Sequence, residues 1–293
     1  MSSAREEFVA QSSVTSVIRV DHGVVPTNDL GRSVTFFTDV LGGRLMRLVN
    51  VNQRGLRREV PQIAFFVLAN HMGWGAALQP QPIPAPTRPM EGPTWGFEID
   101  ERGIEGVKDV LDRRNVSYQG PTEYAAPSPI AATLTVQDPH DFEYELTARR
   151  DDKQGTDPGQ GDLGIRRISH VRLEVTDIEA AKQWYMATLG LVPTDDVPGE
   201  EQVTLQVEET GQLFILHEVP EMSQRSHYPF GPHVDVKVPV GEFEEFTSRL
   251  TNVERYWSPF PHKIPWHEPN MATVYFYDPD GNRLQVSENV PHT

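Results

Sequence analysis

The 293-residue chain contains no cysteine. This absence excludes disulfide bonds, zinc-thiolate centres, iron–sulfur clusters and thiol nucleophiles together. Any metal ion in this protein must therefore be held by nitrogen and oxygen donors, which leaves His, Asp, Glu and Gln as the possible ligands.

Long apolar runs and positive charge are also scarce. No run of about 18 apolar residues is present, and the start MSSAREEFVAQSS does not show the pattern of a signal peptide. The chain has 26 Lys and Arg against 42 Asp and Glu, for a net charge of −16. A nucleic acid or an anionic membrane would be repelled by this charge. We therefore expect a soluble cytoplasmic protein with neither partner.

The sequence repeats itself at two constant offsets. Residues 21–42, which contain His22, match residues 169–190, which contain His170, and both segments close with Leu-Gly. Residues 137–146 (QDPHDFEYEL) likewise match residues 277–286 (YDPDGNRLQV). Such matches indicate two homologous halves, separated by a Gly- and Asp-rich linker. The predicted organisation is an N-terminal tail over 1–16, a first domain over 17–148, a linker over 149–165 and a second domain over 166–290.

Each half contains two modules of the form βαβββ. A short apolar strand runs into an Asp cap and an amphipathic helix that ends at Gly, and further strands follow. The pattern starts again after Gly92 and after Gly231. The predicted fold is α+β, with two tandem domains of paired modules that form open, half-barrel-like mixed sheets. The concave face between two modules is where we expect a site.

Histidines gather at strand ends in the second half. His170 opens the first strand of the third module, His217 closes its last strand, and His233 opens the first strand of the fourth module. Gln285 lies on the final strand, where alternation turns it to the concave face if its apolar neighbours face the helices. Two imidazoles and one oxygen donor can bind Fe(II) or Mn(II) and leave positions for substrate and dioxygen.

The C-terminal segment resembles the vicinal oxygen chelate superfamily, and within it the two-domain type I extradiol ring-cleaving dioxygenases. That signature has a His, an apolar-Tyr pair, Asp-Pro-x-Gly and a metal-binding Glu, and here it reads His267, Val274–Tyr275, Asp278–Gly281 and Gln285. The resemblance implies that His170, His233 and Gln285 are the metal ligands and that the metal is Fe(II), with Mn(II) as the alternative.

The same resemblance implies the remaining functional groups. His217 would be the acid–base group, and His267 and Tyr275 would be second-sphere donors to the bound substrate or oxygen. The implied reaction is cleavage of a small aromatic diol by O2, in a chain that forms a homo-oligomer as many members of the family do. The dioxygenase interpretation therefore rests on six side chains.

Two features keep alternatives open. Gln285 stands where the family has a carboxylate, and a neutral amide should hold Fe(II) more weakly. The first half offers a competing set of the ligand types found in the related glyoxalases, at His22, Gln79 and Glu145, with Thr94 at the fourth equivalent position in place of an imidazole. The alternative functions are a non-redox metal-dependent isomerase, lyase or hydrolase, and a metal-free protein that binds aromatic ligands.

Overall fold

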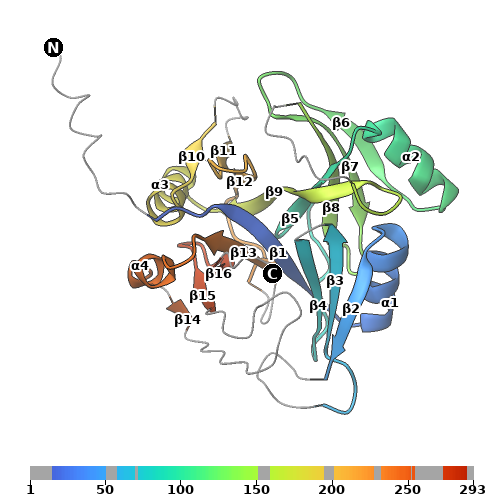
Figure 1. Ribbon diagram of the computed structural model, residues 1–293, viewed down its shortest axis with the longest axis horizontal. Helices are drawn as coiled ribbons and strands as arrows, with labels where there is room; N and C mark the ends of the chain where they lie inside the picture. The colour runs from blue at the N-terminus through green and yellow to red at the C-terminus, as the bar shows by residue number, and fades with distance from the viewer. Residues whose placement is uncertain are drawn as a thin grey trace.

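The protein is described here by a computed structural model. It describes residues 15–50, 58–69, 72–150, 159–194, 201–227, 232–251, 253–254 and 273–288. Two eight-stranded mixed sheets make up most of this part of the chain, and short helices flank them (Figure 1).

The first sheet, called the terminal sheet, is built from the two ends of the chain. Its strands in spatial order are β14 (Val253–Glu254), β15 (Thr273–Tyr277), β16 (Arg283–Glu288), β13 (His233–Val238), β1 (Arg19–Thr27), β4 (Met72–Leu78), β3 (Ile63–Ala69) and β2 (Arg44–Val49).

The second sheet, called the central sheet, is built from the middle of the chain. Its strands in spatial order are β10 (Val192–Pro193), β11 (Gln202–Gln206), β12 (Leu213–Glu218), β9 (Ile165–Val175), β5 (Thr94–Ile99), β8 (Glu143–Arg149), β7 (Ile130–Gln137) and β6 (Gln119–Glu123).

One helix follows the first strand of each module. They are α1 (Leu30–Thr35), which continues as the π-helical turn η1 (Phe36–Val40), α2 (Gly103–Arg113), α3 (Ile178–Leu189) and α4 (Phe243–Ser248). The side chain of Asp29 caps α1 and that of Asp177 caps α3, each by accepting a backbone N–H. Helix α3 ends at Gly190, whose φ of 70° suits a residue without Cβ. None of the helices in the described ranges is long and apolar enough to cross a membrane.

The modules pair differently from the expected arrangement. The α+β class and the open mixed sheets are confirmed, but the first module shares its sheet with the fourth and the second with the third. Strand β1 pairs antiparallel with β13, and β5 pairs antiparallel with β9. Each sheet therefore takes one module from each half.

One large hydrophobic core joins the two sheets. Trp74 of the terminal sheet and Trp95 of the central sheet are both fully buried and meet edge to face with ring centroids 5.2 Å apart. Gly23 makes room for them, since a Cβ there would lie 2.6 Å from the Trp74 ring and 3.0 Å from that of Trp95. The opposite face of each sheet carries buried polar side chains, and on the central sheet it also carries a small apolar cluster that includes Leu213 and Ile215.

Candidate metal centre

The polar face of the terminal sheet is called the terminal cup. On β16, Leu284 and Val286 belong to the core and Gln285 faces the other way, as alternation predicted. His22 of β1 lies opposite Asp235 of β13, and Asp235 lies opposite Gln285. His233 is two residues from Asp235 on the same strand and shares its face. The register thus gathers His22, His233 and Gln285 in one cup.

The ring of His22 is oriented by carboxylates. Its Nδ1 atom lies 3.2 Å from Oδ2 of Asp21 and 3.4 Å from Oδ2 of Asp235. A bulge in β1 beside His22 brings Asp21 to the same side. Since an ionised carboxylate only accepts, Nδ1 carries the proton, and in this tautomer Nε2 is the nitrogen with a lone pair for a metal ion.

A buried lysine balances the two carboxylates. Nζ of Lys237 lies 3.4 Å from Oδ2 of Asp21 and 3.3 Å from Oδ2 of Asp235, and it donates to Oγ of Ser287 at 2.7 Å. Burial raises the pKa of Asp235. Burial acts the same way on Asp21, but Lys237, His22 and Arg19 outweigh it and hold the pKa of Asp21 well below its usual value.

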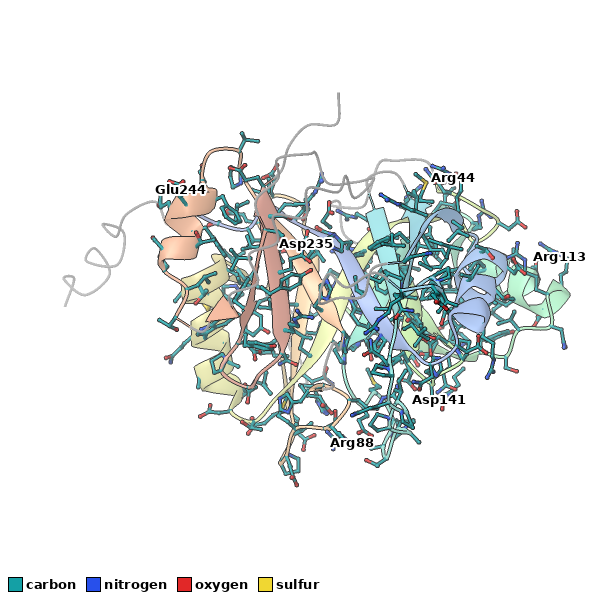
Figure 2. All side chains as sticks on the ribbon, turned by 90° about the horizontal axis from the view of Figure 1, so that it is seen from below. Arg44, Arg88, Arg113, Asp141, Asp235 and Glu244 are labelled. Atoms are coloured by element: carbon teal, nitrogen blue, oxygen red, sulfur yellow. The ribbon has the colours of Figure 1, made fainter. Side chains whose placement is uncertain are left out.

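The carboxylates of Asp21 and Asp235 form, with His22, a group of potential metal ligands within 4.8 Å of one another. The ammonium of Lys237 already supplies a positive charge at the same oxygens. We therefore assign the two carboxylates to orienting the ring of His22, and we do not count them among the metal ligands. Figure 2 shows Asp235 within the body of the molecule, while the other labelled charged residues lie toward its outside.

Two further ligand types stand beside His22. The rings of His22 and His233 lie 6.1 Å apart between centroids and meet edge to face. Gln285 donates from Nε2 to Oγ1 of Thr273 at 2.7 Å. Its carbonyl oxygen Oε1 is buried and accepts no hydrogen bond from the residues described here. Two imidazoles and an available amide oxygen fit a divalent metal ion.

Tyr275 completes the terminal cup. It lies opposite Gln285 on β15, its ring meets that of His233 edge to face at 5.2 Å, and the guanidinium of Arg283 lies 4.3 Å from its ring centre. Tyr275 thus stands next to two of the candidate ligands.

His170 lies elsewhere, on the polar face of the central sheet, called the central cup. Its Nε2 atom is 2.9 Å from Oε2 of Glu145. The imidazole reaches Glu145 across β5 because Gly96 has no side chain, and a Cβ there would lie 2.0 Å from the ring. Arg172 binds the same carboxylate through Nε at 2.9 Å and through its terminal nitrogen at 3.2 Å.

The structure thus corrects the predicted triad of His170, His233 and Gln285. The first residue is on the central sheet and the other two are on the terminal sheet, because β9 pairs with β5 and β13 pairs with β1. His217 is also on the central sheet, opposite Glu174, and the equivalent place beside β1 is held by Ala77. The predicted donor His267 lies outside the described residues.

The competing set from the first half is divided as well. His22 and Gln79 belong to the terminal sheet, where Nε2 of Gln79 donates to the backbone oxygen of Ala77 at 2.9 Å. Thr94 and Glu145 belong to the central sheet. The terminal cup instead combines His22 from one predicted set with His233 and Gln285 from the other.

Sequence reasoning missed the charged support of His22. The segment HVDVKV places Asp235 and Lys237 two residues apart, on one face of a buried strand. Two charges in an otherwise apolar strand were the available signal, since buried charges are paired. Their partner Asp21 could not be found, because it depends on the bulge in β1.

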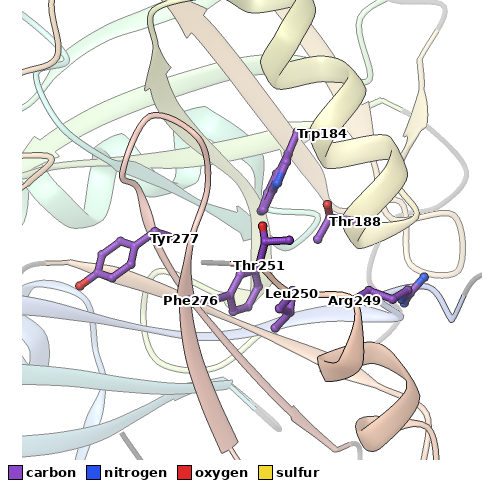
Figure 3. Close-up of a pocket in the computed structure, with 7 residues that line it drawn as sticks. All are labelled: Trp184, Thr188, Arg249, Leu250, Thr251, Phe276 and Tyr277. Carbon is purple, nitrogen blue, oxygen red and sulfur yellow. The ribbon is translucent and has the colours of Figure 1, made fainter. Parts of the chain in front are cut away.

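A pocket lies between α3, the end of α4 and β15. Phe276, which packs into the core, separates it from Tyr275, and Trp184 and Thr188 come from α3 (Figure 3). The remaining lining residues are Arg249, Leu250, Thr251 and Tyr277. This pocket is distinct from the terminal cup.

The comparisons with known proteins agree with one another on the fold. Residues 167–253 match the sequence model of the glyoxalase/bleomycin resistance protein/dioxygenase superfamily. No curated protein matches the chain in sequence. A predicted dioxygenase of Bacillus subtilis has a similar structure, with a TM-score of 0.67 and 14% identity over 94% of this chain and 87% of that one.

Glyoxalase I of Zea mays is similar too, with a TM-score of 0.58 and 16% identity over 92% of each chain. A mutant of the maize enzyme reaches 0.61 and 17% over 92% of this chain and 94% of that one. At these identities the likenesses show the fold, and the match over 167–253 adds the sequence pattern. Residues 167–253 therefore carry the sequence pattern of the glyoxalase/bleomycin resistance protein/dioxygenase superfamily, and the fold of the chain agrees with the resemblance to the vicinal oxygen chelate superfamily.

Proposed function

We propose that the protein is an extradiol-type dioxygenase that opens a catecholic ring with O2 at Fe(II), with Mn(II) as the alternative ion. The proposed ligands are His22, His233 and Gln285, so that His22 replaces its sequence repeat His170. The observation that carries this proposal is the buried Oε1 atom of Gln285, which no described donor satisfies and which lies in the same cup as two buried imidazoles.

The protein's own part is to orient these groups. The carboxylate of Asp21 holds the Nδ1–H of His22 and fixes its ring. Thr273 accepts from the amide nitrogen of Gln285, which fixes the carbonyl oxygen on the other side of the amide. When bound, an ion of this kind offers adjacent positions for the two oxygens of a diol and for dioxygen.

Tyr275 is the proposed proton carrier. Its place beside His233 and opposite Gln285 puts a phenol next to the ligands. A hydroxyl in this place can donate to, or accept from, a substrate hydroxyl. It takes over the role that the sequence assigned to His217, which belongs to the other cup.

A non-redox lyase or isomerase is the second candidate, and the neutral donor set favours it. Two imidazoles and an amide leave the charge of a divalent ion uncompensated, which strengthens its polarisation of substrate oxygens. The carboxylates of Asp21 and Asp235 are already shared with Lys237. Oxygen consumption separates this reaction from the dioxygenase.

The test measures metal content by mass spectrometry on anaerobically purified protein. His22→Ala and His233→Ala should lose iron or manganese, while the matched control His170→Ala should keep the wild-type content. Oxygen uptake on a panel of catechols with a ring-opened product would support the dioxygenase.

Three outcomes contradict the proposal. Metal without oxygen uptake would favour the lyase. A wild type that holds no metal and binds aromatic ligands would favour the metal-free binding protein. Loss of metal in His170→Ala, with none lost in His22→Ala, would move the site to the central cup.

A further inference from the structure

The central cup repeats the terminal cup with different side chains. In each sheet, three neighbouring strands place a histidine, a middle residue and an amide or carboxylate in one row. The row is His22, Asp235 and Gln285 in the terminal sheet, and His170, Gly96 and Glu145 in the central sheet. The equivalent positions are given in pairs, with the residue of the terminal cup first: His22 and His170, Asp235 and Gly96, Gln285 and Glu145, Val24 and Arg172, and His233 and Thr94.

The carboxylate of Glu145 is fully engaged. Its Oε1 atom accepts from Nε of Arg172 at 2.9 Å, and its Oε2 atom lies 3.2 Å from a terminal nitrogen of Arg172 and 2.9 Å from Nε2 of His170. The same terminal nitrogen of Arg172 also lies 3.0 Å from the hydroxyl of Tyr124. Arg172, Glu145 and His170 are all buried residues. The guanidinium of Arg172 thus contacts both oxygens of the Glu145 carboxylate.

The two cups differ in charge at two equivalent positions, and within each cup the two positions balance each other. Where the terminal cup has a neutral amide at Gln285, it has apolar Val24 at the position of the arginine. Where the central cup has the anion of Glu145, it has the cation of Arg172. Burial alone would raise the pKa of Glu145, but Arg172 and His170 outweigh it and lower that pKa to about 2. The carboxylate is therefore ionised and already paired.

We propose that the guanidinium of Arg172 takes the place of a divalent metal ion in the central cup. His170 and Glu145 then form a metal site that the chain keeps closed with its own cation. The ligand class of the opened site is a divalent ion that accepts imidazole and carboxylate donors, such as Zn(II), Co(II) or Mn(II). The inference concerns the central cup and does not depend on whether the terminal cup binds metal.

The test replaces Arg172 by valine, the residue at the equivalent place on β1. Arg172→Val should take up one further equivalent of Co(II) or Zn(II) relative to wild type, measured by calorimetric titration and by the visible absorption of Co(II). Arg172→Lys, which keeps a cation beside Glu145, should take up none. Adding Glu145→Gln to Arg172→Val should abolish the gain.

Thermal unfolding gives a second readout. Arg172→Val leaves a buried carboxylate unpaired and should unfold at a lower temperature than wild type, and added Zn(II) should restore its unfolding temperature. If the variant is unfolded without metal, refolding in Zn(II) should recover it. The proposal is overturned if Arg172→Val neither gains an ion nor regains stability with Zn(II), or if Arg172→Lys gains the ion equally.

Discussion

Glu145→Gln tests how strongly the paired carboxylate stabilises the fold. The pKa of Glu145 is lowered from 4.5 to about 2, and each pKa unit corresponds to about 1.4 kcal/mol of stability. The free energy of unfolding of the wild type should therefore exceed that of Glu145→Gln by about 3 kcal/mol at pH 7. This agrees with the 3–5 kcal/mol expected for breaking a buried ion pair. For a chain of this size the unfolding temperature should fall by roughly 5 °C.

The contribution of Glu145 to stability should depend on pH. Because the folded state lowers the pKa of Glu145, its contribution is complete above about pH 4.5 and is lost as the pH falls toward 2. Urea unfolding at pH 7 and near pH 2.5 measures the difference between wild type and variant, with the exposed Glu123→Gln of β6 as the control. A difference below about 1 kcal/mol at pH 7, or one equally large near pH 2.5, would refute the reasoning.

Three other substitutions probe the described contacts. Gly96→Ala would place a Cβ 2.0 Å from the ring of His170 and should lower the unfolding temperature by several degrees, whereas Gly31→Ala on the exposed side of α1 should not; equal effects would contradict the contact. Gln285→Glu should tighten Fe(II) binding about tenfold or more in a competition titration, because a carboxylate adds charge, and unchanged affinity would exclude this ligand. Burial raises the pKa of Asp278 to about 6, so its contribution to the free energy of unfolding is present below about pH 4 and is lost as the pH rises through 6. Urea unfolding should show that Asp278→Asn removes about 3 kcal/mol of this change with pH. An unchanged pH profile in the variant would contradict the assignment.

Much of the local structure could be predicted because it depends on nearby residues. The caps at Asp29 and Asp177 and the end of α3 at Gly190 follow from side-chain and backbone preferences within one turn. The inward direction of Gln285 follows from the alternation of β16.

The assembly of the site could not be predicted in the same way. His22 and His170 have matching surroundings in the sequence, so either of them can be joined with His233 until the partner of β13 is known. That partner is set by long-range packing of the modules, which leaves no periodic signal. The pairing of Arg172 with Glu145 depends likewise on the register of β5 with β8 and β9.

The crossed pairing of the modules also sets an order for the nascent chain. The central sheet uses residues 94–218 and is available before the fourth module has been synthesised, whereas the terminal sheet joins Arg19 to Lys237. Contacts between such distant residues form slowly, so β1 leaves the ribosome with one edge unpaired and keeps it so until β13 arrives. An apolar strand in that condition is prone to aggregation. A chain that stops in the linker has lost the strand that covers β1, and it should be a substrate for chaperones and proteases.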